Sequence, residues 1–184
     1  RQQEKGLRSV VFTFVPSPAA FFSRSPVKEL STIAEKRRIF EKAGVDYLIE
    51  YPFHQEIADM EPEVFVKEVL AGRLRAKCVV AGEDVSFGKK GAGNYHLLQE
   101  LASNCGYQVI LIEKVSYQDK EVSSTYVREE VRKGNMELAA QLLGTPYHVG
   151  GKIIHGRQLG RTIGMPTVNL LPPSEKLLPP KGVY

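Results

Sequence analysis

Short apolar runs rich in β-branched residues alternate along the chain with amphipathic stretches. Four runs predict strands, at residues 8–15, 46–51, 77–82 and 107–113. The first run, RSVVFTFV, is almost continuously apolar, which is typical of a strand buried on both faces of a parallel sheet. We therefore expect buried parallel strands in this part of the chain.

Helix signals separate the four strands. Ser31 or Thr32 can cap a helix that ends at Gly44, and Pro62 opens a second helix over residues 63–74. Asn94 can cap a third, over residues 95–106. This alternation predicts an α/β fold with a doubly wound parallel sheet. Ligands in such sheets bind outside the carboxyl ends of the strands, which here lead into the loops beginning at Pro16, Gly82 and Ser116.

The residue composition of the chain changes near Gly144. Two short helices are predicted before it, at 125–134 and at 136–144, the second capped by Asn135. Glycine, proline and β-forming residues follow, and they favour barrel or sandwich strands at 147–156 and 166–173. We predict a first domain at 1–144 and the truncated start of a small β-barrel at 145–184. We also expect further residues before Arg1 and after Tyr184, because the chain opens close to a buried strand and forty residues cannot close a barrel.

Composition narrows the class of protein. No apolar run reaches the length of a membrane span, and Cys78 and Cys105 show neither a CxxC spacing nor a cluster with histidine. We expect two structural thiols, a cytoplasmic protein and no membrane partner. The net charge of +4 comes from residues 145–184, which carry 5 Lys/Arg against 1 Asp/Glu. These dispersed charges suit a phosphate-bearing small ligand as well as a nucleic acid, and we expect no nucleic-acid partner. Self-association stays open.

Three consecutive hydroxyl residues, Ser123, Ser124 and Thr125, stand at a predicted helix start, and Arg128 follows one turn later. Free backbone amides, the positive end of the helix dipole and a guanidinium together favour a phosphate. The alternative is a redundant helix cap beside a solvated arginine, and the spacing alone does not separate the two interpretations.

A glycine-rich loop over residues 81–93 directly follows a predicted strand. Its glycines allow close approach of a ligand, Asp84 offers a carboxylate and Phe87 an aromatic face. The lysines at 89 and 90 can hold a phosphate or form a solvated pair. The alternative is a flexible solvent loop, but a loop of this length at the carboxyl end of a strand favours function.

Two weaker signals complete the set. Pro16 and Pro18 rigidify a strand exit, and Phe22 can form one wall of a flat pocket, although on its own this pattern favours buried packing of the phenylalanines. Within residues 160–169, Thr167 and Asn169 share one face of an extended strand and can hold Mg²⁺ with nucleotide phosphates; a polar turn edge is the alternative. The four histidines have no metal-ligand spacing, and no Ser/His/Asp order supports covalent hydrolysis.

In this order and separation the four segments resemble the bacterial bifunctional riboflavin kinase/FAD synthetase, over essentially the whole chain. The resemblance implies an FMN adenylyltransferase domain followed by the start of a riboflavin kinase barrel. It implies ATP-phosphate binding by the Ser-Ser-Thr-x-x-Arg motif, with Arg128 as the catalytic residue, and nucleotide and Mg²⁺ binding by the kinase signature of His155–Gly156, Gly160–Arg161 and Pro166–Asn169. Flavin contacts are implied for Pro16, Pro18, Phe22, Asp84 and Phe87. The implied substrates and products are ATP, FMN, FAD and riboflavin.

The chain departs from the family pattern in two respects. The family's His-x-Gly-His segment and the strand before it are expected upstream of Arg1, so the chain as given is expected to be incomplete for both activities. Val15, Ser17 and Val85 replace the family's usual residues near the flavin. Two alternatives follow: another nucleotidyltransferase of the same superfamily, or a flavin- or nucleotide-binding module without turnover.

Overall fold

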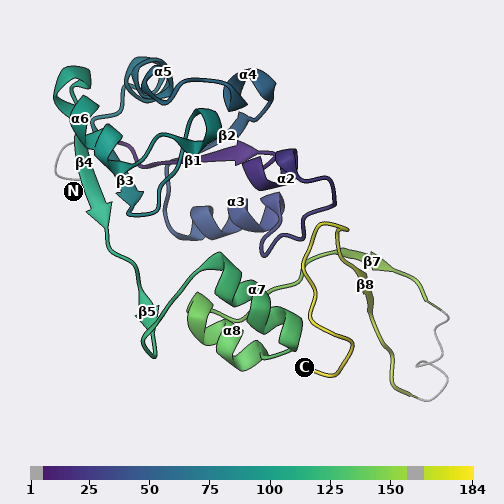
Figure 1. Cartoon of the computed structure of the whole chain (residues 1–184). Helices are drawn as coiled ribbons and strands as arrows, with labels where there is room; N and C mark the ends of the chain where they lie inside the picture. Colours follow the sequence, from purple (N-terminus) through teal and green to yellow (C-terminus); the bar gives the residue numbers. More distant parts are fainter. Residues whose placement is uncertain (1–5, 157–163) are drawn as a thin grey trace. The chain divides into compact units, whose positions relative to one another are not determined.

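The strands and helices expected from the sequence appear at closely similar positions in the computed structural model, which describes residues 6–156 and 164–184 (Figure 1). The chain forms two compact units. Unit 1 comprises Arg1–Ser23 and Val45–Glu121, and unit 2 comprises Arg24–Gly44 and Val122–Tyr184. Each unit is described by itself below.

Unit 1 contains the four predicted strands, which pair two by two. Strand β1 (Val10–Val15) runs parallel to β2 (Tyr47–Pro52), and β3 (Cys78–Gly82) runs parallel to β4 (Gln108–Ile112). Parallel pairing and the mixed α/β class are therefore confirmed. Among the described residues the two pairs share no strand-to-strand hydrogen bonding. A short antiparallel hairpin, which the sequence did not indicate, follows as β5 (Ser116–Tyr117) and β6 (Lys120–Glu121).

The helices of unit 1 connect these strands. A short turn of helix begins at Pro62, as predicted, and widens from Phe65 onward into a π-helix. Asn94 caps the helix before β4, its side-chain oxygen accepting a hydrogen bond from the Leu97 amide at 3.1 Å. In chain order the helical elements are α2 (Pro18–Phe22), α4 (Gln55–Ala58), α5 (Pro62–Val64), η1 (Phe65–Arg73), η2 (Lys89–Gly91) and α6 (Tyr95–Cys105).

The core of unit 1 lies on one face of the strands. Residues of η1 and α6 pack there against alternate strand residues, among them Phe12, Phe14, Val79 and Val109. Val80 points the other way and is 58% exposed. The prediction of a strand buried on both faces is therefore wrong at Val80 of β3, because alternation along a strand places every second side chain away from the face on which η1 and α6 pack. In β1 only Val10 is exposed.

In its described residues, unit 2 is built on three helices and a hairpin. Helix α3 (Ile33–Lys42) begins with a capping box in which Thr32 and Glu35 bond each other's backbone amides, and Gly44 follows its end with a φ of 73°. Helices α7 (Ser124–Lys133) and α8 (Met136–Leu143) pack against each other (Figure 1). Strands β7 (Lys152–Ile154) and β8 (Asn169–Leu171) form an antiparallel pair. The strands predicted after residue 144 are thus present, as a two-stranded hairpin.

The predicted cap of α8 is wrong in one detail. Asn135 occupies the cap position, but its side chain makes no capping hydrogen bond. Its Nδ2 instead donates to Oε2 of Glu130 at 2.6 Å, while Lys133 donates to Oε1 at 2.7 Å. Glu130 is buried, so its carboxylate is stabilised by hydrogen bonds, and the Asn135 side chain supplies one of them.

Residues 28–30 and 174–177 of unit 2 lie side by side. The Glu29 amide donates to the carbonyl of Glu175 at 2.7 Å, and the Leu177 amide donates to the carbonyl of Glu29 at 2.9 Å. Lys28 adds a bond from its ammonium to the Ser174 carbonyl at 2.6 Å. These bonds join segments about as far apart in sequence as the unit allows.

Across residues 6–156 and 164–184, every helix is too short or too polar to cross a membrane.

Candidate functional site

The first turn of α7 presents polar groups to solvent. Ser123 is extended, and its Oγ accepts a hydrogen bond from the Tyr126 amide at 3.2 Å, so this hydroxyl acts as the helix cap. Ser124 and Thr125 are exposed. The first amides of a helix have no hydrogen-bond partner within the helix. Together with the two hydroxyls, they lie at the positive end of the helix dipole. This arrangement is suited to an anion.

Arg128 follows one turn later and is 27% exposed. Its Nη2 lies 3.9 Å from Oε2 of Glu29, an ion pair longer than a hydrogen bond. Glu29 therefore holds the guanidinium loosely and leaves donors for another acceptor. Both interpretations of the Ser-Ser-Thr-x-x-Arg segment are met in part: Ser123 caps the helix, while Ser124, Thr125 and Arg128 keep groups available for a ligand.

The glycine-rich loop after β3 is folded back on itself. Phe87 and Gly93 exchange both of their backbone hydrogen bonds, at 3.1 and 2.8 Å. The Lys89 amide donates to the Met60 carbonyl at 2.8 Å, and its ammonium pairs with Glu61 at 2.9 Å. This hydrogen bond to Glu61 raises the pKa of Lys89. Lys89 therefore belongs to an ion pair with Glu61, and backbone hydrogen bonds hold the loop in a folded conformation.

Two predicted flavin residues sit differently on this loop. Asp84 is largely exposed, and its carboxylate lies 3.7 Å from the ammonium of Lys114. Phe87 is only 8% exposed and packs against Phe65, with 5.7 Å between the ring centroids. Asp84 is therefore open to a ligand, whereas Phe87 shapes the loop from the core side.

The proline-flanked segment after β1 carries an exposed aromatic ring. Ser17 caps α2, with Oγ accepting from the Ala20 amide at 3.3 Å, and both Pro16 and Pro18 are exposed. Phe22 is 63% exposed and stands nearly perpendicular to the rings of Phe21 and Phe53, at 5.1 and 5.9 Å. These edge contacts hold Phe22 in place and leave much of the ring accessible.

The kinase-like segment enters the hairpin of unit 2. Thr167 and Asn169 are both exposed, and Asn169 pairs with Ile154 at one end of β7. The Asn169 side chain lies against Gly156, at a point where a Cβ atom would clash with it. Gly156 therefore allows this contact. Gly160, Arg161, Thr162 and Ile163 lie outside the described residues.

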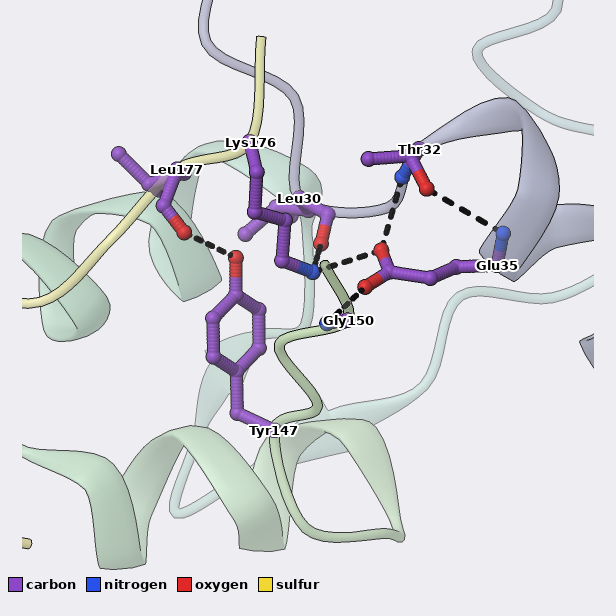
Figure 2. A network of polar contacts seen from close by, with 7 residues as sticks. All are labelled: Leu30, Thr32, Glu35, Tyr147, Gly150, Lys176 and Leu177. Atoms are coloured by element: carbon purple, nitrogen blue, oxygen red, sulfur yellow. Dashed lines mark hydrogen bonds and ion pairs between the residues drawn. The ribbon is translucent and has the colours of Figure 1, made fainter. Parts of the chain in front are cut away.

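A polar network in unit 2 was not anticipated from the sequence (Figure 2). The Lys176 ammonium donates to Oε2 of Glu35 at 2.8 Å and to the Leu30 carbonyl at 2.6 Å, and it lies 4.3 Å from the centre of the Tyr147 ring. Glu35 also accepts from the amides of Thr32 at 2.8 Å and Gly150 at 3.2 Å. The one available signal was the Thr-x-x-Glu capping box, which marks Glu35 but gives no hint of Lys176.

Burial and hydrogen bonding shift the pKa of Glu35 in opposite directions. Burial raises the pKa of Glu35, but the bonds from Lys176, Thr32 and Gly150 outweigh it and leave the pKa below its usual value. Burial, with the nearby Glu35 carboxylate, raises the pKa of Tyr147 to about 12. The Tyr147 hydroxyl donates to the Leu177 carbonyl at 2.8 Å. At neutral pH the network therefore holds an ionised Glu35 carboxylate and a neutral Tyr147 phenol.

Within the described part of the chain, no three His, Cys, Asp or Glu side chains form a group able to hold a metal ion. Cys78 and Cys105 are free thiols.

The predicted residues fall into two sets. Pro16, Pro18, Phe22, Asp84 and Phe87 belong to unit 1, whereas Ser123, Ser124, Thr125, Arg128, Thr167 and Asn169 belong to unit 2. That the aromatic residues and the start of α7 serve one site stays a prediction.

Sequence comparisons match two parts of the chain to known family models. A model described as FAD synthetase matches residues 1–126, and one described as riboflavin kinase matches residues 143–184. A protein of Listeria monocytogenes named bifunctional riboflavin kinase/FMN adenylyltransferase is 38% identical over 183 residues, covering 98% of this chain and 58% of the relative. Relatives of the same name from Bacillus subtilis and Escherichia coli K12 are 36% and 33% identical, each covering 99% of this chain and 58% of the relative.

A solved structure has the same fold along the whole chain. A crystal structure from Streptococcus pneumoniae described as a macrolide-efflux protein superposes with a TM-score of 0.86 at 31% identity, covering 100% of this chain and 60% of its own. The chain thus spans about three-fifths of the length of the proteins it matches.

Proposed function

The chain belongs to the FAD synthetase family, and from this premise we propose that the full-length protein synthesises flavin cofactors. One module transfers the adenylyl group of ATP to FMN, giving FAD and pyrophosphate, and the other phosphorylates riboflavin to FMN with ATP. We assign the first module, built on a doubly wound nucleotidyltransferase sheet, to residues 1–144 and the start of the kinase barrel to residues 145–184. The two family matches and the shared name of the relatives support this assignment.

The observation that carries the proposal is the start of α7, where exposed Ser124 and Thr125 stand one turn before a loosely paired Arg128. In the proposed reaction an oxygen of the FMN phosphate attacks the α-phosphorus of ATP. The bond from that phosphorus to the oxygen bridging to the β-phosphorus breaks, and pyrophosphate leaves. Amides, hydroxyls and the guanidinium then hold the phosphates and offset the developing negative charge.

The exposed side chains of unit 1 supply the proposed flavin contacts. The open ring of Phe22 offers a face for the flavin ring system, with Pro16 and Pro18 fixing the segment before it. Asp84 offers an acceptor for a flavin N–H group. Phe87 supports the same loop from the core, where it packs against Phe65.

The oxygen donors of the kinase-like segment fit Mg²⁺ in a supporting role. The hydroxyl of Thr167 and the amide oxygen of Asn169 are exposed hard donors, and Mg²⁺ commonly takes one or two such protein ligands together with water and phosphate oxygens. We propose that these two residues hold Mg²⁺ with the nucleotide, where the ion would neutralise phosphate charge. The free thiols fit the cytoplasmic location that we also propose.

Product analysis of the full-length protein tests the function. The protein is incubated with ATP, Mg²⁺ and either FMN or riboflavin, and the flavins are separated by chromatography. We expect FAD and an equal amount of pyrophosphate from FMN, and FMN followed by FAD from riboflavin. Flavin binding without turnover would instead support a binding module, and adenylylation or cytidylylation of another acceptor would support a different nucleotidyltransferase. The efflux description of the S. pneumoniae structure gains support only if neither reaction occurs.

A further inference from the structure

Unit 2 contains a cavity of about 460 Å³ that none of the predicted site residues lines. One wall is a face of α3, where Glu35, Arg38, Ile39 and Lys42 recur at helical spacing. The opposite wall is formed by Leu143 and residues 145–150. The volume lies within the range of small-molecule sites in proteins.

Apolar side chains make up much of the wall. Ile39 and Leu143 are 52% and 39% exposed, although both are large aliphatic residues, and Pro146 is exposed beside them. Covering these side chains would remove apolar surface from water, which is favourable. The cavity therefore suits a ligand with an apolar body.

The charged residues that line the cavity differ in whether they have an ion-pair partner. Glu35 and Lys176 both line the cavity, but they bond each other at 2.8 Å and neutralise each other locally. The side chains of Arg38 and Lys42, one helical turn apart and exposed, take part in no ion pair or side-chain hydrogen bond within residues 6–156 and 164–184. Two cations thus remain without a counter-charge at the mouth of an apolar cavity, so the complementary ligand carries a negative group.

Hydrogen bonds hold part of the cavity lining in place before any ligand binds. Gly150 is tied to Glu35 at 3.2 Å, Tyr147 is tied to Leu177 at 2.8 Å, and Lys176 is held from three sides (Figure 2). A wall already ordered by hydrogen bonds loses little conformational entropy when it binds a ligand.

We propose that this cavity, with Arg38 and Lys42 at its mouth and Ile39, Leu143 and Pro146 on its wall, binds a small molecule that has an apolar body and one anionic group. None of the residues assigned above to ATP and flavin lines this site. Its wall draws on both family-matched regions, since α3 lies within residues 1–126 and the opposite wall within residues 143–184. A bound ligand contacts both regions and therefore stabilises unit 2.

The probe for this site is 8-anilinonaphthalene-1-sulfonate, which combines an aromatic body with one sulfonate and fluoresces when it leaves water. Full-length protein is titrated with it in the presence of saturating ATP, Mg²⁺ and FMN, so that the sites of the proposed function are filled. We expect saturable binding at one site. The Arg38→Gln, Lys42→Gln double variant should bind at least about tenfold more weakly, because charge-assisted contacts are lost. Leu143→Trp should also weaken binding by filling the cavity.

The matched control is Lys36→Gln, which removes the same charge from the same helix at a residue that does not line the cavity. Its affinity should stay within about twofold of the parent, since Lys36 does not line the cavity. Thermal unfolding of every variant is followed by circular dichroism. If the double variant does not unfold cooperatively, each single substitution is tested instead, with a loss of about threefold expected for each.

Competition separates the ligand classes. Phenyl phosphate should displace the probe, whereas inorganic phosphate and hexanol at the same concentration should not. Equal affinity in the double variant and in the control would overturn the proposal. Displacement by inorganic phosphate alone would show a simple anion site, and loss of probe binding on saturation with ATP and FMN would show that the probe occupies the substrate sites; either result also overturns it.

Discussion

The ammonium of Lys176 lies 2.8 Å from Oε2 of Glu35, although 141 residues separate the two in sequence. The side chains are 2% and 15% exposed, respectively. The carbonyl of Leu30 and the ring of Tyr147 complete the surroundings of the ammonium. The pair therefore joins the start of α3 to the last residues of the chain inside unit 2.

Removing Lys176 should destabilise unit 2. In Lys176→Met the Glu35 carboxylate loses its charged partner, and we expect the free energy of unfolding to fall by about 2–4 kcal/mol, somewhat less than for a fully buried pair because two amide donors remain. Urea unfolding measured by circular dichroism gives this value. Lys181→Met is the control, because Lys181 is exposed. An equal loss in both variants would show that the network contributes nothing particular.

Acid should weaken the same network. Burial raises the pKa of Glu35, but the hydrogen bonds led by that from Lys176 bring it below 4.5, its ordinary value. The unfolded chain therefore takes up this proton at a higher pH than the folded chain does. The stability from Glu35 is fully present above 4.5 and is lost as the pH falls through the lower folded value. Glu35→Gln should be less stable than the parent near neutral pH, and the gap should narrow in acid. A gap that does not change with pH would contradict this linkage.

Arg128→Ala should impair adenylyl transfer in the full-length enzyme. Loss of one charge-assisted contact to phosphate is expected to cost about 2–3 kcal/mol, roughly a 30- to 150-fold fall in kcat/KM for ATP. Arg132→Ala is the matched control, since Arg132 is exposed near the opposite end of the same helix. Unchanged FAD production by Arg128→Ala would remove the residue from the proposed mechanism.

Gly93→Ala should disturb the loop that carries Asp84. A Cβ at this position would lie 2.5–2.8 Å from three ring carbons of Phe87, and the ring is confined by Phe65. We expect a loss of about 1–3 kcal/mol in unfolding free energy, with weaker FMN binding measured by flavin fluorescence. Gly150→Ala is the comparison, because its Cβ would meet only Oε1 of Glu35 at 3.8 Å. Similar losses in both variants would argue against the overpacking at Phe87.

Thr167 and Asn169 should matter for one reaction only. In the full-length protein, the Thr167→Ala, Asn169→Ala double variant is expected to phosphorylate riboflavin at least about tenfold more slowly, since two polar contacts to nucleotide and metal are lost. FAD formation from supplied FMN should stay within about twofold of the parent. Both rates come from the same chromatographic assay. Loss of adenylylation with riboflavin phosphorylation intact would reverse the assignment.

Sequence patterns located most helices and strands, because the interactions that begin a helix or favour a strand involve neighbouring residues. Caps at Thr32, Asn94 and Ser123 act within three residues, so composition alone marks these helix starts. Asn135 occupies the predicted cap position, but the buried carboxylate of Glu130, five residues earlier, binds its side chain, so no side-chain capping bond forms. Phe87 likewise looks like an exposed ligand platform in sequence, yet packing against Phe65 places it in the core.

By itself the sequence determined the α/β class, the order of strands and helices, and the four motifs on which the family resemblance rests, because apolar periodicity, capping and motif spacing are properties of neighbouring residues. Only the tertiary structure decided that residues 24–44 pack with residues 122–184, that Lys176 meets Glu35, and that one face of α3 opens onto a cavity with two cations at its mouth. The physical reason is that such contacts depend on how the whole chain closes, and hydrophobic packing brings together residues whose separation in sequence leaves no local trace.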